Sequence, residues 1–165
     1  TSTGAGSPPA FEAAAGGGKV LQVVTGTFTS AYTRSALTST FVSVGLNADI
    51  TPSATSSTIL VIANIYAAPA VGASSSNHAG VSLGLFRDET QIGASRQVPL
   101  VTIRHTSECG IAYMDSPSST SSITYDIRGN DIDNGSNSYL SVNDPGASGQ
   151  AIATSSIHLI EIDGS

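Results

Sequence analysis

The sequence predicts an all-β domain of short antiparallel strands, and three observations support that prediction. First, apolar residues follow a period of two in short segments, most clearly where Ile123, Tyr125 and Ile127 share one face of residues 123–128. Second, no window of a dozen residues from Lys19 onward keeps the i, i+3, i+4, i+7 spacing of an amphipathic helix. Third, turn signals recur at the spacing typical of a β-sandwich or barrel.

Other segments divide into strands with one apolar face and strands with two. Residues 42–44, 81–85 and 101–104 alternate apolar and polar side chains, as half-buried strands do. Residues 20–24, 58–65 and 157–162 are apolar on both faces. A strand of the second kind needs cover on both sides, either from a second sheet plus a loop or from another subunit. The pattern therefore predicts self-association.

Several connections are predicted from turn chemistry. Residues 87–90 and 143–146 carry turn signals, and Asn134-Gly135 can take the positive φ angles of a tight hairpin. Residues 67–79 are interpreted as a long exposed loop where binding specificity could lie.

Two hydroxyl-rich segments, residues 52–58 and 117–123, resemble each other. Each begins with a proline, and an aspartate, Asp49 or Asp115, lies shortly before that proline. We interpret them as two equivalent corners between strands. In each, proline ends one strand and hydroxyl groups satisfy the backbone until the next strand begins.

The first eighteen residues differ from the rest. They mix Gly, Ala, Ser and Pro, a composition that buries too little apolar surface to order itself. Residues 1–18 are therefore predicted to be a flexible arm or linker, and residues 19–165 a single β domain. The arm is either a passive tether or a segment that orders on a partner. It lacks the pattern of a signal peptide, which argues against ordinary secretion unless a segment has been removed.

Composition excludes several classes of protein. The formal net charge is −6 and the pI is about 4.7, so a nucleic-acid binder with a basic stripe is not expected. The longest apolar stretch, residues 59–71, is shorter than the roughly 20 residues of a membrane span. Cys109 is the single cysteine, so neither an internal disulfide nor a cysteine-based zinc site can form. We expect Cys109 to be a buried small apolar residue.

No catalytic site or cofactor is predicted. There is no Gly-x-Ser-x-Gly segment. His105 and His158 lie on predicted strands as structural histidines, and His78 lies in a solvated loop. The chain has no Trp to form a sugar platform. The carboxylates considered for glycoside hydrolysis are too dispersed to nominate a catalytic pair: Glu108, Asp115, Asp126, Asp131 and Asp133.

The most ligand-like segment is residues 130–136. Asp131 and Asp133 are weak candidates for Ca²⁺ ligands, since several oxygen donors lie in a short loop. The glycine comes one position early for the helix-loop-helix pattern and no Glu closes the loop, so an Asx-rich turn is favoured over a metal site. The residues nominated for binding loops are Ser74, Ser75, Ser76, Asn77, His78, Asn134 and Asn137.

Five stretches taken in order resemble a β domain of tailed-bacteriophage structural proteins, found in tail fibres and in head fibres or decorations. They are GGGKVLQVV, FVSVGLNADITPSATSSTILVIA, LGLFRDETQIG, YMDSPSSTSSITYDIRG and IHLIEI. The resemblance implies a jelly-roll-like antiparallel β-sandwich in a homotrimeric appendage, without enzyme activity. It assigns no functional residue.

The resulting hypothesis is a virion protein, assembled in the bacterial cytoplasm and exposed on the particle. Its expected partners are itself as a homotrimer, other virion proteins through the N-terminal arm, and a host surface glycan, with no nucleic acid and no membrane insertion. The alternative is a carbohydrate-binding, lectin-like module, for which the aromatic candidates are the four Phe and five Tyr.

Overall fold

The fold is taken from a computed structural model of the chain. It describes residues 19–34, 37–71, 81–98, 107–132, 138–144 and 153–164. The predicted arm at residues 1–18, the predicted strand at residues 101–104 and the predicted hairpin at Asn134-Gly135 lie outside the described residues.

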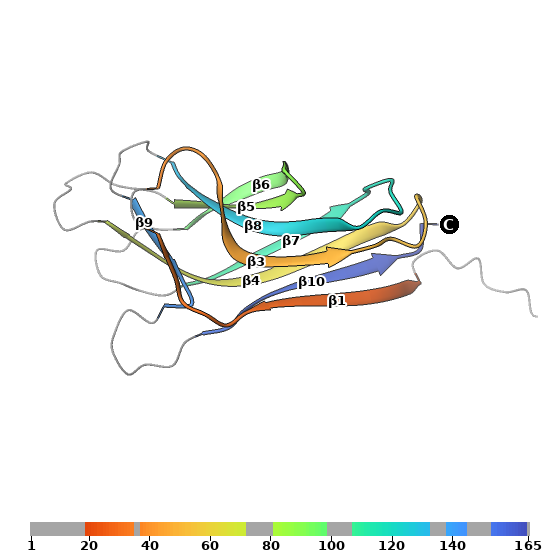
Figure 1. The fold of residues 1–165 in the computed structure, drawn as a ribbon, viewed down its shortest axis with the longest axis horizontal. Coiled ribbons are helices and arrows are strands. Elements are labelled where there is room, and N and C mark those ends of the chain that lie inside the picture. Colours follow the sequence, from red (N-terminus) through yellow and green to blue (C-terminus); the bar gives the residue numbers. More distant parts are fainter. Residues whose placement is uncertain are drawn as a thin grey trace, which may run out of the picture.

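The described residues form ten strands in two antiparallel sheets (Figure 1). The six-stranded sheet, here the large sheet, contains β1 (Val20–Phe28), β2 (Tyr32–Arg34), β4 (Thr58–Val71), β7 (Ser107–Asp115), β9 (Ser138–Val142) and β10 (Ser155–Ile162). The four-stranded sheet, here the small sheet, contains β3 (Val42–Ile50), β5 (Val81–Arg87), β6 (Thr90–Val98) and β8 (Ile123–Asp131). Among these residues no helix is long and apolar enough to cross a bilayer.

The strand order is that of a jelly roll. The large sheet runs β1-β10-β4-β7, and the small sheet runs β3-β8-β5-β6. This arrangement places two interlocked Greek keys face to face, as in jelly-roll domains. Beyond β7, the long strand β4 continues and pairs with β9, which pairs with β2. The prediction of an all-β, jelly-roll-like sandwich is confirmed.

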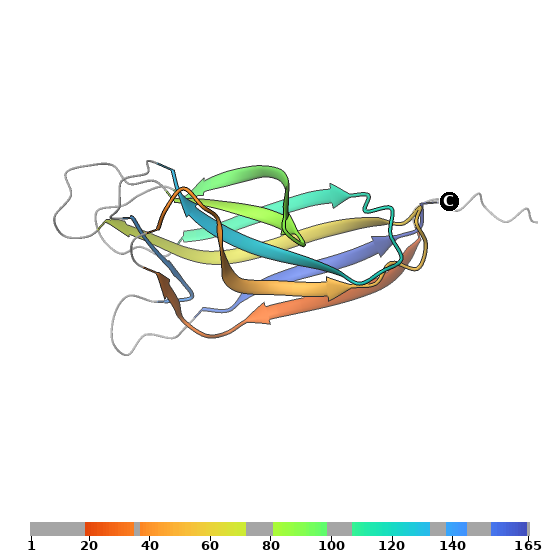
Figure 2. The same cartoon turned by 45° about the horizontal axis from the view of Figure 1, so that its top comes forward.

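The core fills the space between the sheets, because every second side chain of each strand points inward. Ile123, Tyr125 and Ile127 of β8 are at most 4% exposed, as their alternation predicted. The inward residues of the facing large sheet are also buried: Ile59, Val61, Ala63, Ile65, Ala67, Ile157 and Leu159. Figure 2 shows the two layers running along the same long axis.

The two predicted corners lie next to each other at one end of the sandwich (Figure 1). One joins β3 to β4 and the other joins β7 to β8, so each passes from one sheet to the other. The two corners are close together because the strands that they join are paired. Ile50 of β3 pairs with Ile123 of β8, and Ile59 of β4 pairs with Asp115 of β7. Each strand stops just before the proline, as expected.

The β1 and β3 side of the sandwich is closed by a near backbone contact. A Cβ atom added at Gly26 of β1 would lie 2.1 Å from the carbonyl oxygen of Asn47 on β3. Only glycine leaves room for that approach. The opposite side of the sandwich, between β6 and β7, is more open.

Two expectations about exposure are wrong. Residues 67–71 belong to β4 rather than to a loop, because they pair with β9, from Ala67 opposite Val142 to Val71 opposite Ser138. The strand β5 is buried on both faces, although its alternation predicted one exposed face. Its outer side is covered by Phe41, whose ring centroid lies 5.1 Å from that of Phe86.

Candidate interaction surfaces

The nominated binding-loop residues fall outside the described chain. Ser74, Ser75, Ser76, Asn77 and His78 lie between β4 and β5, and Asn134 and Asn137 lie between β8 and β9. The structure does describe strand ends that flank these residues. Val81, at the start of β5, pairs with both Val98 and Asp131. These ends lie together, at the end of the sandwich opposite the two corners (Figure 1).

Of the two calcium candidates, the structure describes one. Asp131 is an inward residue of β8 at 1% exposure, and its N–H donates to the carbonyl oxygen of Thr38 at 2.8 Å. Asp133 lies outside the described residues. Within the described parts of the chain, no three His, Cys, Asp or Glu side chains come together as a metal site would require.

His158 and Asp115 have structural partners. His158 lies on β10 with its Nδ1 atom 3.0 Å from the hydroxyl of Thr25. Asp115 accepts hydrogen bonds from Tyr125 at 2.7 Å and from Arg87 at 2.9 and 3.0 Å. Burial, together with the Asp115 carboxylate, raises the pKa of Tyr125. His105 lies outside the described residues.

Glu161 of β10 is fully buried and anchors the first corner to the large sheet. Its carboxylate accepts hydrogen bonds from Gln22 at 2.6 Å and from Ser57 at 2.7 Å. The N–H and the hydroxyl of Ser53 donate to it as well, at 2.7 and 3.2 Å. Burial alone would raise the pKa of this carboxyl, but these hydrogen bonds outweigh burial and lower the pKa below the ordinary value.

The two corners therefore differ in which groups accept hydrogen bonds from their backbone N–H groups. At the first, the Glu161 carboxylate receives the backbone N–H of Ser53. At the second, hydroxyl groups do this, as predicted for both, because the Ser121 N–H donates to the Ser119 hydroxyl at 3.0 Å. The sequence gives no local sign of the first arrangement, since Glu161 lies more than a hundred positions from the corner.

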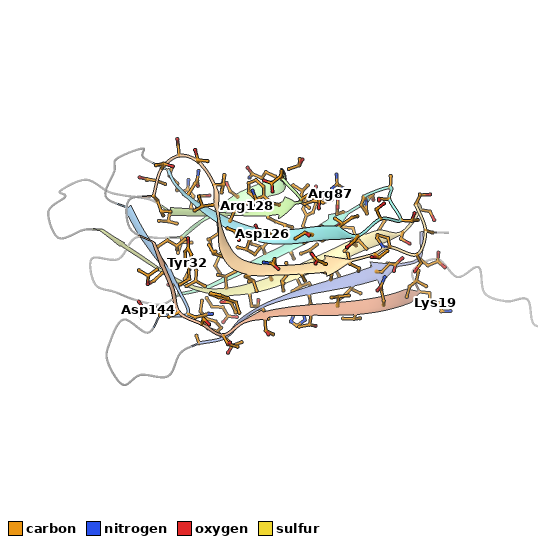
Figure 3. The ribbon with its side chains drawn as sticks, in the orientation of Figure 1. Lys19, Tyr32, Arg87, Asp126, Arg128 and Asp144 are labelled. Carbon is orange, nitrogen blue, oxygen red and sulfur yellow. The ribbon has the colours of Figure 1, made fainter. Side chains whose placement is uncertain are left out.

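The outer face of the small sheet carries a polar network centred on Arg128 of β8. Arg128 bonds the carboxylates of Asp126 and Glu89, each at 2.9 Å, and lies 4.7 Å above the ring of Phe86. Ser43 donates to Asp126 from β3 at 2.8 Å. Burial raises the pKa of Asp126, although Ser43 and Arg128 act against it. Figure 3 labels Arg87, Asp126 and Arg128 along this sheet.

The outer face of the large sheet carries a group of apolar side chains, next to polar outward residues such as Thr25 and His158. One row of side chains crosses four strands in register, from Val23 to Ile160, Leu60 and Met114. Val23 and Met114 at its two ends are 58% and 51% exposed. Further outward positions extend the row, and we call the whole set the apolar face: Val20, Leu21, Val23, Leu60, Ile62, Ala112, Met114, Ile160 and Ile162.

A small pocket of about 200 Å³ lies between β6 and β7. Tyr113 lines one side, and Ser95 and Arg96 line the other. The Tyr113 ring packs over Gly93, where an added Cβ would lie 2.8 Å from it. Cys109 nearby is only partly buried, less than predicted, and burial raises the pKa of its thiol.

No protein-family model matches the chain, and no curated protein matches it. A solved structure that matches is described as the crystal structure of the infectious bursal disease virus VP2 subviral particle, with a TM-score of 0.41 and 14% identity. The match covers 86% of this chain and only 37% of the other.

Proposed function

We propose that this chain is a non-enzymatic structural domain of a virus particle, specifically a homotrimeric fibre, knob or capsid decoration domain of a bacteriophage. The strands form the scaffold, and the connections at the end opposite the corners face the host or the solvent. Residues 1–18 join the domain to other virion proteins. The domain is then assembled in the bacterial cytoplasm and exposed on the particle surface.

The observation that carries this proposal is a jelly roll whose large sheet leaves an apolar outer face uncovered. Jelly rolls occur in viral capsid domains, in lectins and in cupins, so the fold alone does not select among them. The uncovered face favours an assembling domain, because a monomer gains nothing from exposing aliphatic side chains in register. The described histidine and buried carboxylates are engaged in structural contacts, which also suits a scaffold.

Two measurements test the proposal. Native mass spectrometry at micromolar concentration should give three times the 16.6 kDa mass of the chain. Antibodies raised against the domain should label particles in the source sample when viewed by electron microscopy. A folded monomer would contradict the trimer, and particles that stay unlabelled would contradict the virion assignment.

Carbohydrate binding is the second candidate, and the pocket between β6 and β7 favours it. Sugar sites combine an aromatic face with planar polar groups, and Tyr113 and Arg96 both line this pocket. Its volume is below the roughly 300–1,000 Å³ of ordinary ligand pockets, so it would hold no more than one sugar ring.

A glycan array tests this candidate, with Tyr113→Ala and Arg96→Met as variants and Gln91→Ala as a control outside the pocket. Sugar binding that both variants lose and the control keeps would support it. An array without hits, with and without Ca²⁺, would remove it.

A further inference from the structure

The apolar face carries an inference that deepens the proposed function. Among the described residues five large apolar side chains are exposed, and four of them, Val20, Leu21, Val23 and Met114, belong to this face. The fifth, Ile132, directly follows β8 of the small sheet. The exposure is therefore concentrated on one side of one sheet, which is unlike the scattered apolar exposure of an ordinary surface.

Charge indicates what covers this face. The chain carries a formal net charge of −6, so two copies repel each other over most of their surfaces. At the outward positions of β1, β10, β4 and β7, the described residues include one carboxylate, Glu108. Glu108 pairs with Tyr66, three outward rows from Met114. Copies that meet through the apolar face bring no carboxylates together.

The chemistry of the row argues against other occupants. Val23, Ile160, Leu60 and Met114 offer no hydrogen-bonding side-chain group to a sugar or a polar peptide. They also offer no cation to an anionic lipid surface. An aliphatic row is complementary to another aliphatic row, and this chain supplies the same row in every copy.

We propose that the apolar face packs against the same face of other copies of this chain. This inference rests on the homotrimer of the proposed function and names its contact surface. The row spans the sheet from edge to edge, so in a trimer the β1 half of one copy meets the β7 half of the next.

The size of the face predicts a weak association. Four strands about 4.8 Å apart and three outward rows about 6.8 Å apart cover roughly 400 Å², an area that also holds the outward polar residues Thr25, Thr58 and His158. A stable two-body contact buries about 800 Å² on each partner, so a pair that uses the whole face is weakly held. A trimer divides the same face between two neighbours, and closing the ring makes its last association an intramolecular step.

Single charged substitutions test the inference. Val23→Lys and Met114→Lys change the two exposed ends of the row, where a lysine causes no clash in the folded monomer. Ile132→Lys is the matched control, because Ile132 is an aliphatic residue 40% exposed outside the face. Analytical ultracentrifugation from 1 µM to 1 mM gives the association constant of each protein, and thermal melts monitored by circular dichroism show that each is folded.

We expect the wild type and Ile132→Lys to associate alike. Both face variants should be folded monomers or dissociate at least about tenfold more readily, because association would bury an unpaired charge. If the face variants associate as strongly as the wild type, this inference is wrong and the proposed trimer stands on another surface. A wild type that is monomeric at micromolar concentration contradicts the proposed trimer, and one that stays monomeric to 1 mM also overturns this inference. A monomeric wild type that floats with neutral phosphatidylcholine vesicles, while Met114→Lys does not, would assign the face to lipid and also overturn the inference.

Discussion

The hydrogen-bond networks of Glu161 and Arg128 lie on opposite sides of their sheets. The large sheet turns Glu161 inward, and aliphatic side chains outward on the apolar face. The small sheet turns its apolar residues and Asp131 inward and carries Asp126 and Arg128 on its outer side. The network on the small sheet is completed within one copy, whereas the apolar face of the large sheet stays exposed.

Stability and assembly therefore depend on different parts of the molecule. Contacts inside one copy, such as those of Glu161 and Arg128, should determine the free energy of unfolding. The apolar face makes few contacts within the copy, so changes there should alter association and leave folding nearly unchanged. Substitutions in the two regions should separate these two effects.

Replacing Glu161 with alanine should lower the free energy of unfolding by about 3 kcal/mol. The change removes the acceptor of Ser57, Gln22 and the Ser53 N–H, and buried donors left without a partner are costly. Urea unfolding measures the loss. Glu108→Ala is the control, because it removes an exposed carboxylate of the same sheet and should change the stability by less than about 0.5 kcal/mol. Equal effects of the two changes would contradict an anchoring role for Glu161.

Replacing Arg128 with methionine should cost about 2 kcal/mol. Asp126 is 5% exposed and would lose its cationic partner, and Phe86 would lose the guanidinium above its ring. Arg96→Met, at an exposed position of β6, should be nearly neutral. Chemical unfolding of both variants checks the difference, and a neutral Arg128→Met would show that the outer network contributes nothing to stability.

Two of the buried carboxylates, Glu161 and Asp126, should respond to acid with opposite signs. The folded pKa of Glu161 is lowered, so its stabilising contribution is present above the ordinary pKa of a glutamate and is lost as pH falls through the folded value. The folded pKa of Asp126 is raised, so the folded state binds its proton more readily, and the cost of the buried charge is relieved as pH falls.

Stability measured from pH 7 down to pH 3 tests this contrast. The gap between wild type and Glu161→Gln should shrink as pH falls. The free energy of unfolding of Asp126→Asn minus that of the wild type should fall as pH falls. The same difference for Glu161→Gln should rise over this range. Parallel pH profiles for the two variants would contradict the opposite placement of charge.

The smallest effect is expected on the apolar face itself. Val23→Thr is isosteric and 58% exposed, so it should change the unfolding free energy of a single copy by less than about 0.5 kcal/mol. Val61→Thr on the same sheet points inward at 0% exposure and should cost about 1–2 kcal/mol, because its hydroxyl is buried. A similar cost for both would mean that the apolar face is already covered within one copy.

The sequence predicted the features that depend on local pattern. Alternation identified the buried side of β8, and the prolines marked the ends of β3 and β7, since strand period and proline chemistry act over a few residues. Three features depended on distant partners and were not predictable. Residues 67–71 became strand through β9, the outer side of β5 was covered by Phe41, and Glu161 found its donors at the first corner.

The functional surface was foreseen only in part. The apolar character of both sides of residues 20–24, 58–65 and 157–162 predicted that something must cover them, but not which side would stay open. Met114 showed no such signal, and it joins the row only because β7 pairs with β4. Register, which the sequence does not display, brings its side chain beside Leu60.

The two boundaries of the folded unit lie side by side. The N–H of Asp163, after β10, donates to the carbonyl oxygen of Lys19, before β1, at 2.8 Å. A domain whose entry and exit touch can be moved between polypeptides as a cassette, or opened at another loop with these ends fused, without disturbing its strands. The same sandwich can thus be placed within chains of different architecture while its far end diversifies.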